Sequence, residues 1–225
     1  MKHVTFRGFP ADAIAFFEGL VADNSREYWT ANKDTYERAV KGPMAALIEE
    51  VDERYRPLRM FRPNRDVRFS ADKSPYKTNI AAVGERAGGA IYYVHLSADG
   101  LYAGSGYYHM ANDQLDRYRR AVVDDRTGKE IVALIAAAEK QGCEAMARDE
   151  LKTAPRGYAK DHPRIALLRK KGLGTGRGWP VAAWLGTAKA KARVEEVWRT
   201  GDGVNDWLDA HVGPTEEPPD PRNSF

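Results

Sequence analysis

Five cationic and two carboxylate side chains lie between Arg62 and Lys77, so this short segment has a net charge of +3, equal to that of the whole chain. Cationic groups this close together repel one another unless an anion offsets their charge. The segment also contains turn-forming residues, among them Asn64 and Pro75, which disfavour a plain solvated helix face. We therefore expect a shaped cationic site that takes an anionic group.

The order of the residues indicates how these charges are arranged. If residues 65–69 form a strand, alternation places Arg65, Val67 and Phe69 on one face and Asp66 with Arg68 on the other. Asp66 would then hold the guanidinium group of Arg68 for a two-point contact with an oxyanion.

Further along the segment, Asp72 is expected to orient Lys73 or Lys77 in the same way. Tyr76 is a candidate proton donor, because a neighbouring lysine lowers the pKa of a phenol. The candidate anion-binding residues of the segment are Arg65, Asp66, Arg68, Asp72, Lys73 and Lys77. The alternative is a polar network that ties a long loop to the sheet, since such networks resemble functional sites.

A second basic segment runs from Arg156 to Lys171, with six cations and one carboxylate and a net charge of +5. Pro155 and Gly157 prevent a helix at its start and indicate a turn. Asp161 is then expected to cap a helix that begins at residues 162–163, and a helix start favours anions. Arg156 is a candidate binding residue, and Tyr158 and His162 are candidate proton-transfer groups. The alternative is a solvated basic helix that follows a structural turn.

Helical periodicity and cap residues predict the elements around these segments. The expected helices cover residues 10–21, 25–40 with Asn24 as N-cap, a stretch from 43, a stretch from 112 or 113, 127–140, a stretch after 163, and 187–198. The expected strands cover residues 80–83, 90–96 and 101–108, with a hairpin turn at Asp99-Gly100, joined by residues 67–69. The glycine-rich residues 172–178 fail the phosphate-loop pattern and are interpreted as a flexible loop.

These elements predict an α+β fold, an antiparallel β-meander flanked by several helices. A chain of 225 residues with 43% hydrophobic residues suits a single compact domain, which we place at residues 1–212. Residues 213–225 contain four prolines and no apolar pattern, so we expect a disordered tail.

Composition limits the remaining possibilities. The single cysteine, Cys143, excludes an intramolecular disulfide, and the first residues lack the apolar stretch of a signal peptide. No apolar run approaches the roughly 20 residues that span a bilayer. We therefore expect a cytoplasmic protein without a membrane partner. The five histidines are scattered, so no metal site is predicted, and the sequence indicates neither a cofactor nor an oligomeric state.

Both segments resemble signatures of one bacterial family. The stretch Arg65 to Thr78 resembles the first signature of domain of unknown function 2461, and residues 155–163 resemble the second. Residues 9–29 agree in order, with Phe9-Pro10, Phe16-Phe17 and a segment from Asn24 to Trp29. The resemblance covers about residues 6–208 and implies no activity, cofactor or catalytic residue.

Three functions remain open on these residues. The first is a cationic pocket in which both basic segments meet around a phosphorylated or other anionic small molecule, with or without a reaction on it. The second is a nucleic-acid-binding module, which requires a continuous basic face and binding that falls steeply with salt. The third is a structural or partner-binding protein whose charged clusters only hold loops in place.

Overall fold

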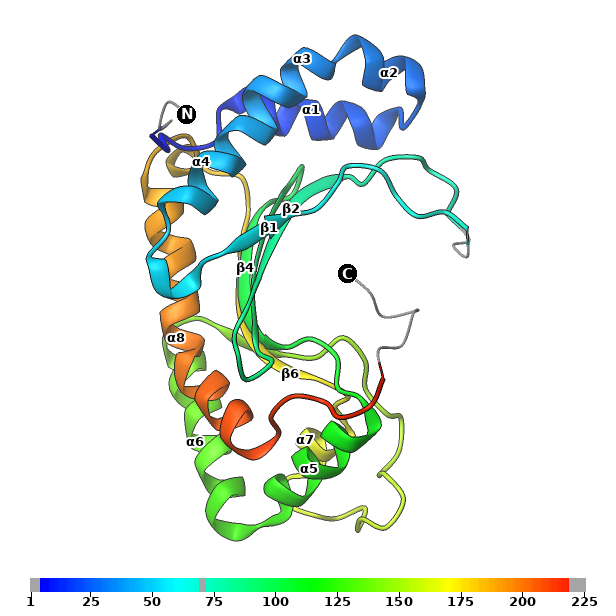
Figure 1. Cartoon of the computed structure of the whole chain (residues 1–225), viewed down its shortest axis with the longest axis vertical. Helices are drawn as coiled ribbons and strands as arrows, with labels where there is room; N and C mark the ends of the chain where they lie inside the picture. Colours follow the sequence, from blue (N-terminus) through cyan, green and yellow to red (C-terminus); the bar gives the residue numbers. More distant parts are fainter. Residues whose placement is uncertain (1–4, 69–71, 219–225) are drawn as a thin grey trace. The chain divides into compact units, whose positions relative to one another are not determined.

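The computed structural model describes residues 5–68 and 72–218, and its sheet has six strands in the order β1-β2-β3-β4-β6-β5 (Figure 1). The strands are β1 (Leu58–Met60), β2 (Asn79–Glu85), β3 (Ile91–Ser97), β4 (Gly100–Tyr107), β5 (Glu144–Met146) and β6 (Leu173–Trp179). Because β2, β3 and β4 are neighbours in both sequence and space, the predicted meander is confirmed, and with it the α+β class. Val67 and Arg68 do not join the sheet as predicted, since Leu58–Met60 pairs with β2 instead, and Phe69 of the predicted strand lies outside the described residues.

Strand β3 shows why this part of the sheet could be predicted. Its burial alternates along the strand, with Tyr92, Val94 and Leu96 buried and the residues between them half-buried. This period of two is typical of a strand with one face on the core. Gly100 has a φ of +126°, a conformation that favours glycine, so the Asp99-Gly100 turn signal marks the start of β4.

Two compact units divide the chain. Unit 1 comprises Met1–Glu85, Tyr92–Ala103 and Gly178–Glu196, and unit 2 comprises Arg86–Ile91, Gly104–Arg177 and Val197–Phe225. The first basic segment belongs to unit 1 and the second to unit 2.

The helices of unit 1 are α1 (Ala11–Ala22), α2 (Arg26–Ala31), α3 (Lys33–Thr35) and α4 (Gly42–Glu50). Helix α1 buries Ile14, Phe17 and Leu20, the face that its period predicted. The helix predicted at residues 25–40 is interrupted, and a π-helical turn at Tyr36–Lys41 leads directly into α4. The N–H of Gly42 bonds to the carbonyl of Glu37, five residues back, so each helical turn contains one more residue here than in an α-helix. Pro43, which follows, has no N–H to donate.

Unit 2 contains α5 (Asn112–Val123), α6 (Asp125–Lys140) and α7 (Ile165–Arg169), and α8 (Lys189–His211) has residues in both units. Ile131 and Ile135 of α6 join Tyr118 and Trp207 in the core of the unit. Helix α8 is much longer than the predicted 187–198, because it continues through Gly201 and Gly203. A Cβ at Gly201 would lie 2.3 Å from Ser105 Oγ, so the absent side chain lets α8 approach β4. No helix within the described ranges is long and apolar enough to cross a bilayer.

The start of the proline-rich segment contacts α5. The Asp113 carboxylate accepts hydrogen bonds from Thr215 Oγ1 at 2.7 Å and from the Glu216 N–H at 2.9 Å. The Gln114 side-chain amide donates to the carbonyl of Gly213 at 2.9 Å. Residues 219–225 of the predicted tail lie outside the described residues.

Strand β6 corrects the prediction of a flexible loop at residues 172–178. Its first four residues, Leu173 to Gly176, are buried, and Gly174 lies directly against β4. A Cβ at Gly174 would be 2.5 Å from the Ser105 carbonyl oxygen, and one at Gly106 would be 2.3 Å from the Gly174 Cα. Glycine within a strand often marks such a close approach of two backbones. Composition indicated a loop here because the side chains that normally identify a strand are the ones that the packing excludes.

We predict that Gly174→Ala lowers the free energy of unfolding by about 1–3 kcal/mol, because the new methyl group overlaps the β4 backbone. Gly178→Ala is the matched control in the same strand, since its Cβ would meet nothing closer than Tyr102 Cδ2 at 3.7 Å. Urea denaturation of both variants measures the difference. Equal stability of the two variants would contradict the close packing of β6 on β4.

Candidate functional site

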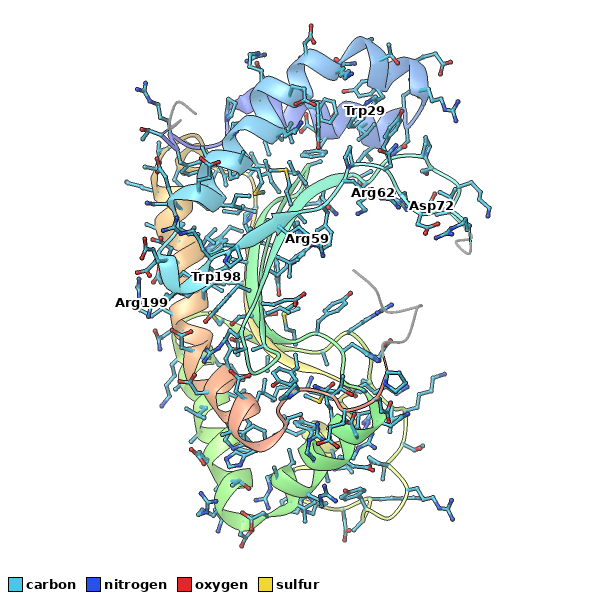
Figure 2. All side chains as sticks on the ribbon, viewed as in Figure 1. Trp29, Arg59, Arg62, Asp72, Trp198 and Arg199 are labelled. Carbon is cyan, nitrogen blue, oxygen red and sulfur yellow. The ribbon has the colours of Figure 1, made fainter. Side chains whose placement is uncertain are left out.

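The first basic segment continues the antiparallel pairing of β1 and β2, and we call its described residues, 61–68 and 72–78, the arm. The N–H of Phe61 bonds to the Ala81 carbonyl at 2.9 Å, and the N–H of Lys77 bonds to the Pro63 carbonyl at 2.8 Å. Asn64 and Tyr76 form a further antiparallel bridge. These main-chain bonds place the charged side chains of the signature on one extended element (Figure 2).

Side chains alternate along the first half of the arm as predicted. Arg65 and Val67 are half-buried, whereas Asp66 and Arg68 are exposed on the other side. Phe69, predicted to share the face of Arg65, lies outside the described residues.

Both carboxylate oxygens of Asp66 accept hydrogen bonds from the guanidinium group of Arg68. Arg68 Nε donates to Asp66 Oδ1 at 3.0 Å, and a terminal nitrogen of Arg68 donates to Oδ2 at 2.6 Å. The hydrogen bonds from Arg68 lower the pKa of Asp66 to about 2. The pair therefore fixes the plane of an exposed guanidinium group, the arrangement expected from the alternation.

Asp72 contacts the arginine of the opposite strand. Its Oδ2 pairs with Arg65, and its Oδ1 accepts from the Ser74 N–H at 2.9 Å and the Ser74 hydroxyl at 2.5 Å. The hydrogen bonds from Ser74, followed by the charge of Arg65, lower the pKa of Asp72. Lys73, the expected partner, donates to the Val67 carbonyl at 2.9 Å. Arg65 and Lys73 therefore both help to close the arm.

Tyr76 anchors the arm to the helices of unit 1. Asn24 donates its side-chain N–H to the Tyr76 carbonyl at 3.1 Å and accepts the Tyr76 N–H at 3.0 Å. The ring of Trp29 on α2 stacks on the Tyr76 ring, with centroids 4.2 Å apart and planes 9° from parallel. Tyr76 is only 9% exposed, so the candidate proton donor is also a packing residue.

The role of Asn24 corrects the predicted N-cap. Ser25 caps α2, because its hydroxyl accepts the N–H of Tyr28 at 3.0 Å. Only an amide side chain both donates and accepts as a peptide group does, so Asn24 pairs with Tyr76 as a neighbouring strand would. The Asn-Ser spacing allowed either residue to be the cap, and only the position of the arm distinguishes them.

Lys77 lies half-buried among other cations. Its Nζ is 5.0 Å from the centroid of the Phe61 ring, and the Arg59 guanidinium carbon is 5.2 Å from the same centroid. Burial lowers the pKa of Lys77, and the charges of Arg62, Arg59 and Arg65 lower it further. Arg59 lies outside the basic segment identified in the sequence. It belongs to this group of cations because β1 places it against the Phe61 ring.

The second basic segment forms a turn and a short helix in unit 2. Arg156 is exposed in the turn, which closes with a bond from the Tyr158 N–H to the Pro155 carbonyl at 3.2 Å. The ring of Tyr158 packs on the core of the unit. His162 Nδ1 accepts the N–H of Arg164 at 3.1 Å. Helix α7 begins only at Ile165, without a side-chain cap, so the helix start predicted at residues 162–163 with an Asp161 cap is wrong.

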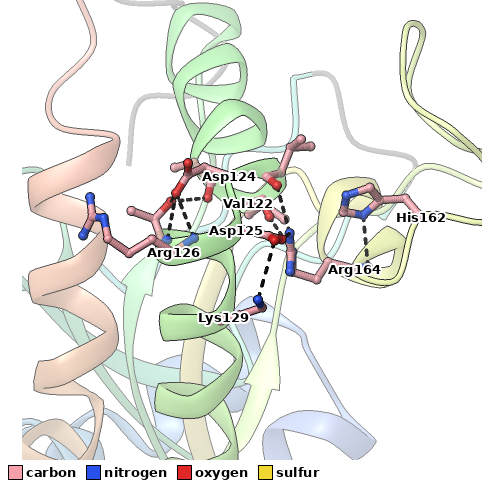
Figure 3. A network of polar contacts seen from close by, with 10 residues as sticks. Val122, Asp124, Asp125, Arg126, Lys129, His162 and Arg164 are labelled. Carbon is pink, nitrogen blue, oxygen red and sulfur yellow. Dashed lines mark hydrogen bonds and ion pairs between the residues drawn. The ribbon is translucent and has the colours of Figure 1, made fainter.

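Arg164 has a structural role that the sequence did not reveal. Its side chain is 10% exposed, and it donates to the carbonyls of Val122 at 2.7 Å and Val123 at 2.8 Å (Figure 3). It also bonds to Asp125 at 3.2 Å and lowers the pKa of that carboxyl. Arg164 thus satisfies the last carbonyls of α5 and connects them to the first turn of α6. In the sequence it looks like one more charge of a basic surface.

The predicted site residues therefore fall into two groups. Unit 1 holds Arg65, Asp66, Arg68, Asp72, Lys73, Tyr76 and Lys77 on the arm. Unit 2 holds Arg156, Tyr158 and His162. That the two groups share one pocket stays a prediction.

The chain matches the sequence model of a known protein family. The family described as "Conserved hypothetical protein (DUF2461)" matches residues 12–207, most of its length. The chain belongs to the DUF2461 family. The match includes both signatures, so the resemblance inferred from them is confirmed. No match to the chain was found among the curated proteins or among the solved structures.

In this DUF2461 protein, we predict that Asn24→Ala lowers the free energy of unfolding by about 1–3 kcal/mol, because two main-chain groups of Tyr76 lose their partners. Hydrogen exchange of the Tyr76 amide should speed up in parallel. Asn32→Ala is the control, since its side-chain N–H donates to the Tyr28 carbonyl within the same helical region at 2.9 Å. Unchanged exchange at Tyr76 would show that Asn24 does not hold the arm.

The Asp66–Arg68 pair also predicts a pH dependence. Because the pKa of Asp66 is lowered on folding to about 2, the contact stabilises the arm above the ordinary pKa of 3.8 and loses this effect as pH falls toward 2. We expect the side-chain carboxyl signal of Asp66 to titrate near pH 2 by NMR. In Arg68→Ala the midpoint should rise toward 3.8, whereas in Arg38→Ala, which breaks a distant surface pair with Asp12, it should not move.

Proposed function

We propose that this DUF2461 protein binds a phosphorylated or other anionic small molecule through the cations of the arm and β1. The observation that supports this most is the group Arg59, Arg62 and Lys77. Lys77 is half-buried, and among the described residues neither it nor Arg62 forms a hydrogen bond or ion pair with a carboxylate, although the charge of Arg62 also acts on Asp66. Cations held close together with few paired carboxylates attract an anion, and their mutual repulsion falls when one binds.

The surroundings of Lys77 make it the centre of the proposed site. Burial lowers its pKa most, and the charges of Arg62, Arg59 and Arg65 lower it further. Phe61 lies against both Lys77 and Arg59 and holds these cations at its ring through cation–π contacts. A bound dianion would offset the repulsion among them and raise the pKa of Lys77 again.

The other cations of the arm support a structural role, which is the second candidate function. Arg65 pairs with Asp72, Arg68 pairs with Asp66, and Lys73 donates to a main-chain carbonyl. These contacts alone would serve a protein whose charges only shape the hairpin. Residues of the arm would therefore have different roles: Arg65, Asp66, Asp72 and Lys73 shape it, and Asp66 presents Arg68. Lys77 would receive the anion together with Arg62 and with Arg59 of β1.

We predict that a thermal-shift panel of phosphate, sulfate, sugar phosphates, nucleotides and short oligonucleotides at fixed salt finds a saturable rise in melting temperature with a small phosphorylated compound. Lys77→Gln and Arg62→Gln should each weaken that binding about tenfold, which corresponds to about 1.4 kcal/mol. Arg62 is exposed, so its replacement tests binding without disturbing the fold. Lys33→Gln, an exposed lysine of α3, is the charge-matched control.

Two outcomes would overturn this proposal. Shifts that occur only with oligonucleotides and disappear as salt rises would favour the nucleic-acid alternative. No shift with any compound, together with a lower melting temperature for Arg65→Ala and for Lys73→Ala, would leave the structural role.

A further inference from the structure

A hollow of about 290 Å³ lies in unit 2, where α5 ends and α6 begins. The polar residues that line it are Arg117, Arg120, Asp124, Arg126, Thr127 and His211. Three arginines and a histidine face one carboxylate, so the lining is cationic. None of these residues belongs to the two basic segments identified in the sequence.

Arg117 forms a rigid wall of the hollow. A terminal nitrogen of its guanidinium group pairs with Asp113 at 3.0 Å, and the other donates to the Pro214 carbonyl at 2.7 Å. Its Nε donates to the carbonyl of Val212, beside His211 at the end of α8. The position of Arg117 is therefore fixed before any ligand arrives.

The carboxylate in the hollow is already used. Asp124 Oδ1 accepts the N–H of Arg126 at 3.1 Å, and both the N–H and the hydroxyl of Thr127 at 2.9 Å. The hydrogen bond from the Thr127 N–H is the main reason that the pKa of Asp124 is lowered. Asp124 thus caps α6, and these donors offset much of its negative charge.

Arg120 and Arg126 have no such partners. Both side chains are exposed, and within the described ranges neither guanidinium group has a hydrogen bond or ion pair. Figure 3 shows the Arg126 side chain extending away from the Asp124 carboxylate. Arg120 lies in the last turn of α5, where a cation is favourable. Arg126 lies in the first turn of α6, where the helix dipole makes a cation unfavourable, and its charge is only the last of the causes that lower the pKa of Asp124.

We propose that this hollow is a second anion site that binds a small phosphate-class oxyanion. Arg120 and Arg126 supply charged planar donors that match two oxygens of such an ion, and Arg117 and His211 supply fixed walls. The site stands apart from the arm in its residues, so each proposal can fail without the other. The cations surround one hollow rather than follow a groove, which favours a small ion over a nucleic-acid backbone.

Calorimetric titration with inorganic phosphate and with pyrophosphate tests the proposal. We expect saturable binding that Arg120→Ala/Arg126→Ala weakens by at least about tenfold. The matched control is Lys152→Ala/Arg199→Ala, which removes two exposed charges of unit 2 outside the hollow and should bind as the wild type does. Lys77→Gln should leave this binding unchanged, which separates it from binding at the arm.

A second measurement distinguishes binding from a merely structural role. Arg126→Ala alone should raise the melting temperature without phosphate, because it removes a cation from a helix start, and should reduce the rise that phosphate causes. The NMR signal of Arg126 Nε–H should move on addition of pyrophosphate in the wild type. The proposal is overturned if no saturable binding occurs, if the control variant loses binding equally, or if only oligonucleotides bind.

Discussion

The pairing of Asn24 with the main chain of Tyr76 is the interaction on which the arm, and with it the proposed site of unit 1, depends. The arm leaves the sheet as a two-stranded ribbon, and such ribbons are marginally stable alone. Two hydrogen bonds from one amide and the stacked Trp29 ring give the ribbon a third neighbour. The segment from Asn24 to Trp29 and the first signature, which contains Tyr76, are therefore parts of one structural unit.

The cations of the arm fall into two groups, according to whether they have a hydrogen-bond acceptor within the arm. Arg65, Arg68 and Lys73 have acceptors within the hairpin, whereas the group around Lys77 gathers cations from β1 and from both sides of the arm. The same division recurs in unit 2, where Arg164 and Arg117 satisfy helix ends and main-chain carbonyls while Arg120 and Arg126 remain exposed. In both units, some cations satisfy main-chain carbonyls or carboxylates, and others lie beside them without a hydrogen bond to either in the part of the chain that the structure describes.

The sequence predicted the helices and strands in which apolar side chains recur at regular spacing. Helix α1, the helices α5 and α6, and the meander strand β3 all bury one face at regular spacing, and each was expected close to its true place. The Asp66–Arg68 contact was also predictable, because alternation within one strand determines it. The roles of Asn24, Arg59 and Arg164 were not, since their partners lie more than twenty residues away or on another element. Strand β6 was missed because neighbouring backbones, rather than its own side chains, define it.

The position of β6 is determined by the small size of its residues rather than by their hydropathy. At Gly174, Gly106 and Gly201 the requirement is for volume close to zero, and polarity hardly matters. A profile of hydropathy therefore passes over the junction of β4, β6 and α8, whereas a profile of residue size would find it. Small substitutions at these glycines are therefore not tolerated, since even a methyl group overlaps a backbone or side-chain atom of the neighbouring element.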